Sequence, residues 1–217
     1  MNLNKWLLPT QADNDDNDCL NRCSLVVISS YFKKEWSDLA DRCLKFISSS
    51  APIFVRFPEA DYRNTSGDQI AGIWCMKAIG YDIDIRNLFF AANTMDTSVG
   101  KWKLPIGDFI LLRVLPLWIR TLDQRLSFLR HIADICLIWL AISDLLYYRI
   151  SDDGADCNNT MVSLMTCNRV QPTFISRTVW RLWKQYSDFE KRLRRYHRKE
   201  ALANPEIAEW LIEAANK

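Results

Sequence analysis

Apolar positions recur at helical spacing over much of the chain. In residues 35–47, six apolar side chains return every three or four positions: Trp36, Leu39, Ala40, Cys43, Leu44 and Ile47. This spacing puts them on one face of an α-helix, so a helix is predicted there. Ser66 is a suitable N-cap for a second helix from about 67 to 79, and Gly80 is expected to end it.

Three stretches of the first half do not follow a helical period. Residues 20–32 form a short apolar run that fits either a strand or a helix. Residues 51–58, which contain two prolines, are predicted as a short strand or extended segment. Residues 81–87 alternate apolar and polar side chains, which is the period of a half-buried strand. Residues 93–103 are expected to form a loop.

The second half is predicted to be helical almost throughout. Pro105 suits a first helical position, and Pro116 is expected to end or kink that helix. Thr121 and Gln124 match a capping box, which would open a long apolar helix reaching about Tyr148.

The remaining segments alternate between turn signals and helical periods. Turn-forming residues fill 151–160, which is therefore predicted as a loop, and a short helix is expected over 160–167. Thr173, which follows a proline, is expected to begin a long amphipathic helix over 174–202. An Asn-Pro-Glu start signal precedes a last helix over 205–215.

These patterns predict a mainly α fold: a helical domain with a long C-terminal amphipathic helix and two candidate short strands in the N-terminal half. Residues 1–18 contain an acidic patch and are predicted to be a flexible acidic arm. Residues 19–217 are expected to form a single mainly helical domain, with candidate lobes at 19–103 and 104–217.

The predicted helix 174–202 has two distinct faces. Seven apolar residues, spaced alternately by four and three, form a seam: Ile175, Val179, Leu182, Tyr186, Phe189, Leu193 and Tyr196. Eight cations are predicted on the opposite side: Arg177, Arg181, Lys184, Lys191, Arg192, Arg195, Arg198 and Lys199. Solvated helix faces usually mix charge signs, because Glu–Lys pairs at i,i+4 stabilise a helix. A face with one sign of charge therefore indicates an anionic partner. The candidates are nucleic acid phosphate, anionic lipid, or an acidic protein surface, which includes the chain's own acidic arm.

The net charge of +2 conceals a strong asymmetry. Residues 169–199 carry ten Lys and Arg against two acids, whereas the rest of the chain has an excess of six acids. Arginine predominates among the cations, and its planar guanidinium can bind a phosphate through two hydrogen bonds. We therefore expect a non-enzymatic nucleic-acid-binding subunit or adaptor of a larger nucleoprotein assembly, which contacts phosphates through the basic face of 174–202.

Sequence-specific recognition is not indicated. Trp180 and Trp183 border the apolar seam and could stack on bases, although widening the buried stripe is the favoured interpretation. No helix-turn-helix, zinc-finger or RNA-binding sheet motif is present, so binding is expected to be non-specific, and the choice between DNA and RNA stays open.

Two other hypotheses remain open at this point. The chain could be a protein–protein interaction module that docks by its C-terminal helix. It could also be a small ribonuclease, because Arg125-x5-His131 and Arg192-x4-His197 resemble the Arg-x4–6-His motif of HEPN-type ribonucleases. That resemblance implies a cation and an imidazole acting on an RNA phosphate. No catalytic residue is assigned.

The cysteines and apolar segments bear on compartment and cofactors. Seven cysteines without regular spacing favour free thiols and a cytoplasmic protein. Cys19 and Cys23 lack the two further ligands of a structural zinc site, so no metal and no cofactor are expected. The apolar segments 104–119 and 131–150 contain internal charges, which favours buried helices over membrane spans.

Asp134 and Asp144 are the most unusual charges in the chain, since both lie in an apolar helix. Structural ion pairs with a buried arginine would explain them. The candidates for that arginine are Arg113 and Arg130.

Overall fold

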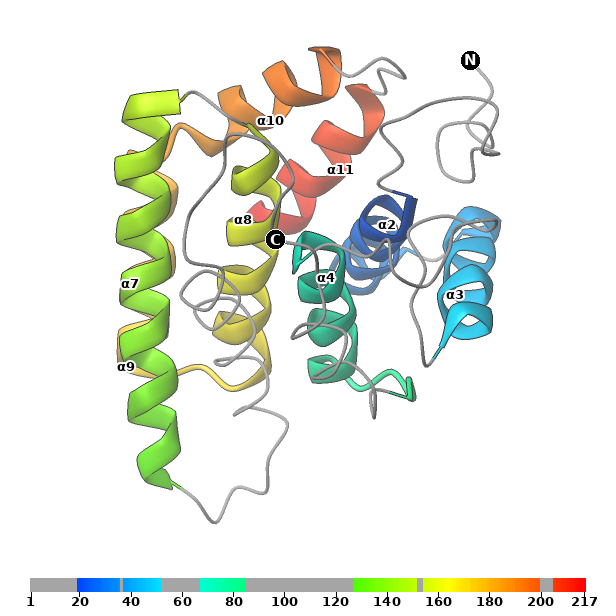
Figure 1. The fold of residues 1–217 in the computed structure, drawn as a ribbon, viewed down its shortest axis with the longest axis horizontal. Coiled ribbons are helices and arrows are strands. Elements are labelled where there is room, and N and C mark those ends of the chain that lie inside the picture. The colour runs from blue at the N-terminus through cyan, green and yellow to red at the C-terminus, as the bar shows by residue number, and fades with distance from the viewer. Residues whose placement is uncertain (1–18, 36, 52–66, 85–126, 152–153, 200–204) are drawn as a thin grey trace.

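The computed structural model describes residues 19–35, 37–51, 67–84, 127–151, 154–199 and 205–217 (Figure 1). These residues form eight helices and no strand, which confirms the mainly α prediction. The helices are α2 (Cys19–Lys33), α3 (Asp38–Ser50), α4 (Gly67–Ala78), α7 (Ser127–Ser151), α8 (Gly154–Val170), α9 (Phe174–Tyr186), α10 (Phe189–Lys199) and α11 (Pro205–Asn216).

Two helices occupy the centre of the fold. Residues 19–30 of α2 and 157–167 of α8 are buried on every side. Helix α2 packs against α3, α4 and α11, whereas α8 packs against α4, α7, α9 and α10 (Figure 1). One apolar core runs through all of these contacts, from Cys19 to Ala215.

Local residues form the ends of two helices in the first half, and one of these ends, at Gly80, was predicted from the sequence. The Ser37 hydroxyl accepts a hydrogen bond from the Ala40 amide at the start of α3 (3.3 Å). After α4, Gly80 adopts φ 104°, and the Tyr81 amide donates to the Met76 carbonyl (3.1 Å). This left-handed glycine with a six-to-one hydrogen bond is a Schellman ending, which confirms Gly80 as the stop signal.

The ambiguous run at 20–32 is helical and belongs to α2. The strand predicted at 81–87 is not formed at 81–84, the part that the structure describes. The predictions for residues 1–18, 52–58 and 85–126 lie outside the described residues. They include the helix at Pro105, the kink at Pro116 and the capping box at Thr121. The single-domain boundary at 19–217 therefore stays a prediction.

The loop prediction for 151–160 is wrong over 154–160, because α8 begins at Gly154. The polar residues that suggested a loop instead face other helices. Asn159 is buried and accepts a hydrogen bond from Asn21 of α2 (3.3 Å). Farther along α8, Ser163 and Thr166 approach the buried Cys75 thiol of α4. Packing of this kind overrides the weak local preference of Asn, Ser and Thr for turns.

Helices α7 and α9 run parallel to each other, joined by α8. The Thr173 hydroxyl donates to Asp134 (2.8 Å), and the Trp183 indole donates to Asp144 (2.8 Å). Each bond joins residues 39 apart in the sequence, so the two helices keep one register over three turns.

The first and last described helices are neighbours. Helix α2 packs on α11, and Lys33 at the end of α2 forms an ion pair with Glu213 of α11 (2.9 Å). The Lys33 ammonium also lies 5.6 Å from the ring centre of Trp210. Among the described residues, none of the helices combines the length and apolarity needed to cross a bilayer.

Candidate nucleic-acid interface

The helix predicted over 174–202 is wrong in one respect: it is two helices, α9 and α10, separated at Ser187 and Asp188. Asp188 adopts a left-handed backbone with φ 48°, which a short polar side chain tolerates better than most. In a straight helix, Trp183 and Phe189 would point about 120° apart. The break turns both toward one core, where their ring centres lie 5.8 Å apart.

This break also disrupts the predicted apolar seam. Phe189 and Leu193 of α10 are buried, but Leu182 and Tyr186 of α9 are exposed at 42% and 64%. The buried face of α9 is formed by Ser176, Trp180 and Trp183 instead. Trp180 and Trp183 stack on each other with ring centres 5.8 Å apart. Both tryptophans are buried, as the favoured interpretation expected, but on α9 they replace the predicted seam rather than widen it.

Arg192 was predicted to contact phosphate, and the structure contradicts this. Its guanidinium forms two hydrogen bonds with the Asp144 carboxylate (2.8 and 3.0 Å), and the two side chains are only 2% and 1% exposed. Asp144 does have a buried arginine partner, as expected, but it is Arg192 rather than Arg130 or Arg113. Arg192 lies four residues after Asp188, beyond the break. A single straight helix over 174–202 would place it on the solvent side, so its burial could not be predicted from the sequence.

The Lys184 side chain also forms hydrogen bonds within the fold. Its ammonium donates to the Ala215 carbonyl (3.0 Å) and to the Asn216 side chain (2.6 Å). Arg169 donates to the neighbouring Ala214 carbonyl (2.6 Å). These carbonyls end α11, where the helix dipole favours cations. Burial lowers the pKa of both Lys184 and Arg169. Part of the positive charge of 169–199 thus stabilises the chain's own helix.

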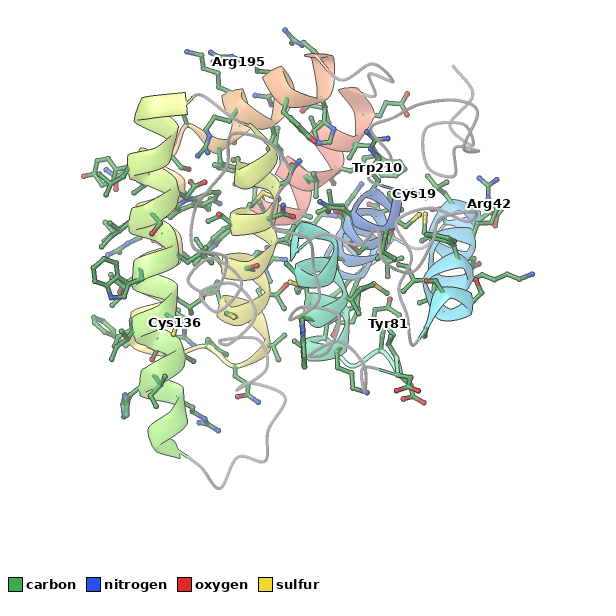
Figure 2. The ribbon with its side chains drawn as sticks, in the orientation of Figure 1. Cys19, Arg42, Tyr81, Cys136, Arg195 and Trp210 are labelled. Atoms are coloured by element: carbon green, nitrogen blue, oxygen red, sulfur yellow. The ribbon has the colours of Figure 1, made fainter. Side chains whose placement is uncertain are left out.

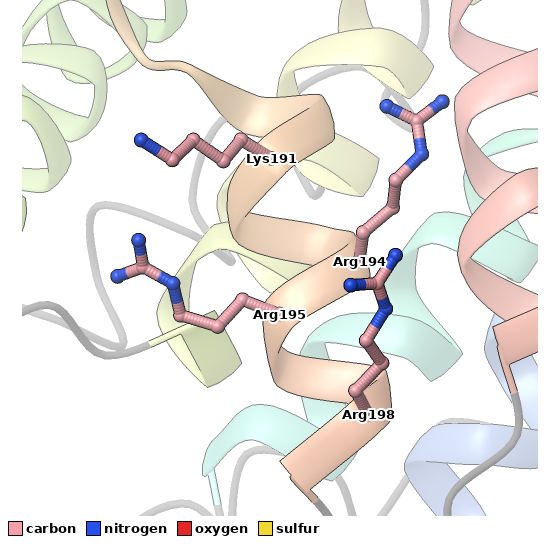
Figure 3. A pocket seen from close by; sticks show the side chains of 4 residues that line it. All are labelled: Lys191, Arg194, Arg195 and Arg198. Carbon is pink, nitrogen blue, oxygen red and sulfur yellow. The ribbon is translucent and has the colours of Figure 1, made fainter.

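Four cations gather along one face of α10: Lys191 and Arg198 are exposed, whereas Arg194 and Arg195 are half-buried. Lys191, Arg194, Arg195 and Arg198 are spaced i, i+3, i+4 and i+7, and they line an open hollow of about 440 Å³ (Figure 3). We call these four residues the α10 basic stripe. Arg194 pairs with Glu209 (2.8 Å) and Glu190 (3.3 Å), and was not among the predicted residues. The other three were predicted from the sequence.

The stripe is split between two directions. Figure 3 shows Arg194 and Arg198 extending toward one side of α10, with Lys191 and Arg195 extending toward the other. The hollow therefore offers cations on two walls. The hydrogen bond from Arg194 lowers the pKa of Glu209, so this carboxylate stays ionised and neutralises part of the wall formed by Arg194.

The remaining predicted cations lie beside the stripe in sequence. Arg177 and Arg181 are exposed on α9. Lys199 is the last residue of α10, and its side chain lies outside the described part of the chain. Of the eight predicted phosphate contacts, the structure therefore removes Arg192 from the surface and gives Lys184 another role.

The ribonuclease motif does not form an accessible pair. His197 is 1% exposed, and burial, followed by the charge of Arg22, lowers its pKa to about 4. Arg192 is held by Asp144, as described above. An RNA phosphate cannot reach either side chain in this arrangement. His131 is exposed on α7, and the Arg125 of its motif lies outside the described residues.

None of the seven cysteines is bridged in a disulfide. The Cys23 thiol lies beside those of Cys19 and Cys43, and burial is the largest cause of its strongly raised pKa. Burial likewise raises the pKa of Cys75 to about 12. Such thiols stay protonated and pack as small apolar groups. The described residues contain no group of three or more His, Cys, Asp or Glu that could hold a metal ion.

The α10 basic stripe thus places four cations around one open hollow (Figure 2 shows Arg195 at the outer edge of the molecule). Chemically, it can bind an anion but has no nucleophile or general base beside it among its lining residues. No protein-family model, curated protein or solved structure matches this chain.

Proposed function

We propose that this chain is a non-enzymatic nucleic-acid-binding subunit or adaptor of a larger nucleoprotein assembly. It contacts phosphates through the α10 basic stripe, with Lys191, Arg195 and Arg198 as the principal groups. The observation that carries the proposal is the gathering of four cations on one open face of a single helix, around a hollow of about 440 Å³. Lys199 in the same helix, and Arg177 and Arg181 on α9, extend the set.

The spacing of the stripe suits a polyanion. Seven residues of helix span about 10 Å, and duplex DNA presents about one charge per 1.7 Å of its axis. The stripe therefore covers several phosphates at once. Lys191 and Arg198 are exposed, and each lies three and four residues from Arg194 and Arg195. Like charges at these spacings weaken an isolated helix. Bound phosphate would relieve that repulsion.

Phosphate contact without base recognition is favoured by the aromatic residues. Trp180 and Trp183 are buried against the core, so neither is available to stack on a base. Contacts to phosphate position a protein on nucleic acid but carry no sequence information. Binding is therefore expected to be similar for DNA and RNA of any sequence.

Docking of a protein partner on the apolar seam of the C-terminal helix is less favoured. Phe189 and Leu193 of that seam are buried in the chain's own core, and Leu193 is fully covered. A partner would have to displace this packing. If the stripe bound an acidic protein surface instead, the wild type would show no salt-sensitive binding to DNA or RNA.

The test is the salt dependence of binding to a generic DNA duplex and to a single-stranded RNA. Each phosphate contact contributes a slope of about 0.7–0.9 in a plot of log K against log salt. The triple variant Lys191→Gln, Arg195→Gln and Arg198→Gln is therefore expected to bind more weakly, with a slope smaller by about 2 to 3.

A matched control removes three cations elsewhere: Lys34→Gln, Arg42→Gln and Lys45→Gln. Arg42 and Lys45 are exposed on α3, which is far along the molecule from α10 (Figure 2). The control has the same net charge as the α10 variant and should retain wild-type binding and slope. Equal losses in the two variants would indicate only a net-charge effect and would refute the proposed site. Absence of salt-sensitive binding by the wild type would refute the function.

A further inference from the structure

Helix α7 exposes a continuous apolar stripe. Five of its residues are large, apolar and between 39% and 58% exposed: Ile132, Ile135, Trp139, Ile142 and Leu146. Their spacing is 3, 4, 3 and 4, the a/d pattern of a helix that packs against another helix. We call these five residues the α7 seam.

The α7 seam lies on the side of the helix turned away from the rest of the described fold. On a helical wheel its centre is about 180° from that of the buried face, which includes Asp134, Leu137 and Asp144. That buried face packs on α8 and α9. Figure 1 shows α7 at the edge of the molecule, with α8 on its inner side and α9 behind it.

The exposed area is unusually large for one helix face. Large side chains present areas of the order of 150–250 Å², so the exposed fractions leave roughly 500 Å² of apolar surface. Patches at this upper end of the range for monomers are commonly interaction sites. Between Ile132 and Leu146 every exposed residue of α7 belongs to the seam, and the two charged residues of that stretch, Asp134 and Asp144, are buried. A solvent-facing helix normally carries its charges on the outer side.

The order of residues in the seam is nearly palindromic about Trp139. Ile132 and Leu146 lie seven residues before and after it, and Ile135 and Ile142 lie four before and three after. A twofold axis at Trp139 would therefore pair Ile132 with Leu146 and Ile135 with Ile142 of an antiparallel copy. A surface that is its own complement is the requirement of an isologous dimer interface.

We propose that the α7 seam is the interface of a homodimer, in which two copies of α7 pack antiparallel across a twofold axis near Trp139. Two seams would bury roughly 1,000 Å², which is the lower size limit of a specific interface. A dimer that forms at concentrations on the order of micromolar is therefore expected. Antiparallel packing also places each helix N-terminus near the C-terminus of the other, which the helix dipoles favour. This inference is independent of the α10 basic stripe.

Sedimentation equilibrium of the full chain over about 1–500 µM tests the proposal. The mass of the wild type should rise from that of a monomer toward that of a dimer. Trp139→Lys should weaken the dimer by about 30-fold or more, because central aromatic residues dominate such interfaces. Far-UV circular dichroism should be unchanged, since Trp139 is 57% exposed. Tyr31→Lys is the matched control: Tyr31 is 45% exposed on α2, and this variant should dimerise like the wild type.

Cross-linking tests the orientation without removing Trp139. In a Cys136→Ser background, Ile132→Cys and Leu146→Cys are prepared as separate proteins. Mild oxidation of their mixture should give the mixed dimer as the main product, because the antiparallel arrangement brings these two positions together. Preferential coupling of Ile132→Cys with itself would contradict that arrangement. The proposal would be overturned if the wild type stayed monomeric throughout the concentration range. This holds also if the monomer bound lipid vesicles or another protein instead.

Discussion

The buried ion pair between Asp144 and Arg192 provides the sharpest test of the structure. The Asp144 carboxylate accepts three hydrogen bonds, two from Arg192 and one from the Trp183 indole. Both charged side chains are almost fully buried. Asp144→Asn keeps the shape of the side chain but removes its charge, which leaves the guanidinium buried without a counter-charge. Breaking such a pair on one side costs about 3–5 kcal/mol.

This cost can be converted into a melting temperature. For a chain of this size, 1 kcal/mol of stability corresponds to about 2–4 °C, so Asp144→Asn should melt about 6–20 °C below the wild type. Denaturant unfolding followed by tryptophan fluorescence measures the free energy directly. Glu209→Gln is the control, because the Arg194–Glu209 pair is largely exposed, with side chains 38% and 56% accessible. Its loss should cost under about 1 kcal/mol.

The double variant Asp144→Leu with Arg192→Met separates pairing from burial. Replacing both partners of a buried ion pair by apolar residues is often neutral or stabilising. Most of the loss should therefore be recovered. The Trp183 N–H would still lack its acceptor, which costs about 1–3 kcal/mol. A cost below about 1 kcal/mol for Asp144→Asn, or a double variant less stable than Asp144→Asn, would refute this account of the ion pair.

Two further predictions concern stability. The folded-state pKa of His197 is about 4, below the ordinary 6.5, so the unfolded chain takes up the proton first as the pH falls. Stability is then complete above about pH 6.5 and decreases by roughly 3 kcal/mol toward pH 4; the difference in unfolding free energy between wild type and His197→Gln should follow this curve, and a difference independent of pH would contradict it. Gly72→Ala should destabilise the fold by about 1–3 kcal/mol, because the new Cβ would overlap Ser24 Oγ and lie 2.7 Å from Ser24 Cβ. Ser24→Gly should rescue part of that loss in the double variant, and strict additivity of the two changes in denaturant unfolding would show that they do not touch.

The sequence predicted those helices whose ends carry local signals. Ser37 and Thr173 accept hydrogen bonds from backbone amides of their own first turns, and Gly80 forms its stop through its own backbone. Such features depend on neighbours within a few residues, so they can be read from the chain. The start of α8 could not, because its Asn, Ser and Thr residues are helical only through contacts with α2 and α4.

The candidate site was predicted in part for a related reason. Lys191, Arg195 and Arg198 lie within the last 11-residue helix of the segment, where helical spacing holds. Lys184 was assigned to the surface because the predicted seam put the buried face of α9 at Leu182 and Tyr186 rather than at Trp180 and Trp183. Arg192 was assigned to the surface because a straight helix was assumed across Asp188. A single left-handed residue redirects the side chains that follow it. The apolar spacing continues across the break, so it gives no sign of that turn.

The neighbouring positions of α2 and α11 have a consequence for folding during synthesis. Lys33 ends α2 and Pro205 begins α11, so the ribosome must add more than 170 residues after α2 before α11 begins to be synthesised. At about 5–20 residues per second, this takes roughly 10–30 s. Among the described helices that pack on α2, only α3 and α4 are available to the nascent α2 during that interval. A chaperone that binds apolar segments has this time window in which to act on α2, and a ribosome paused within α8 would lengthen it.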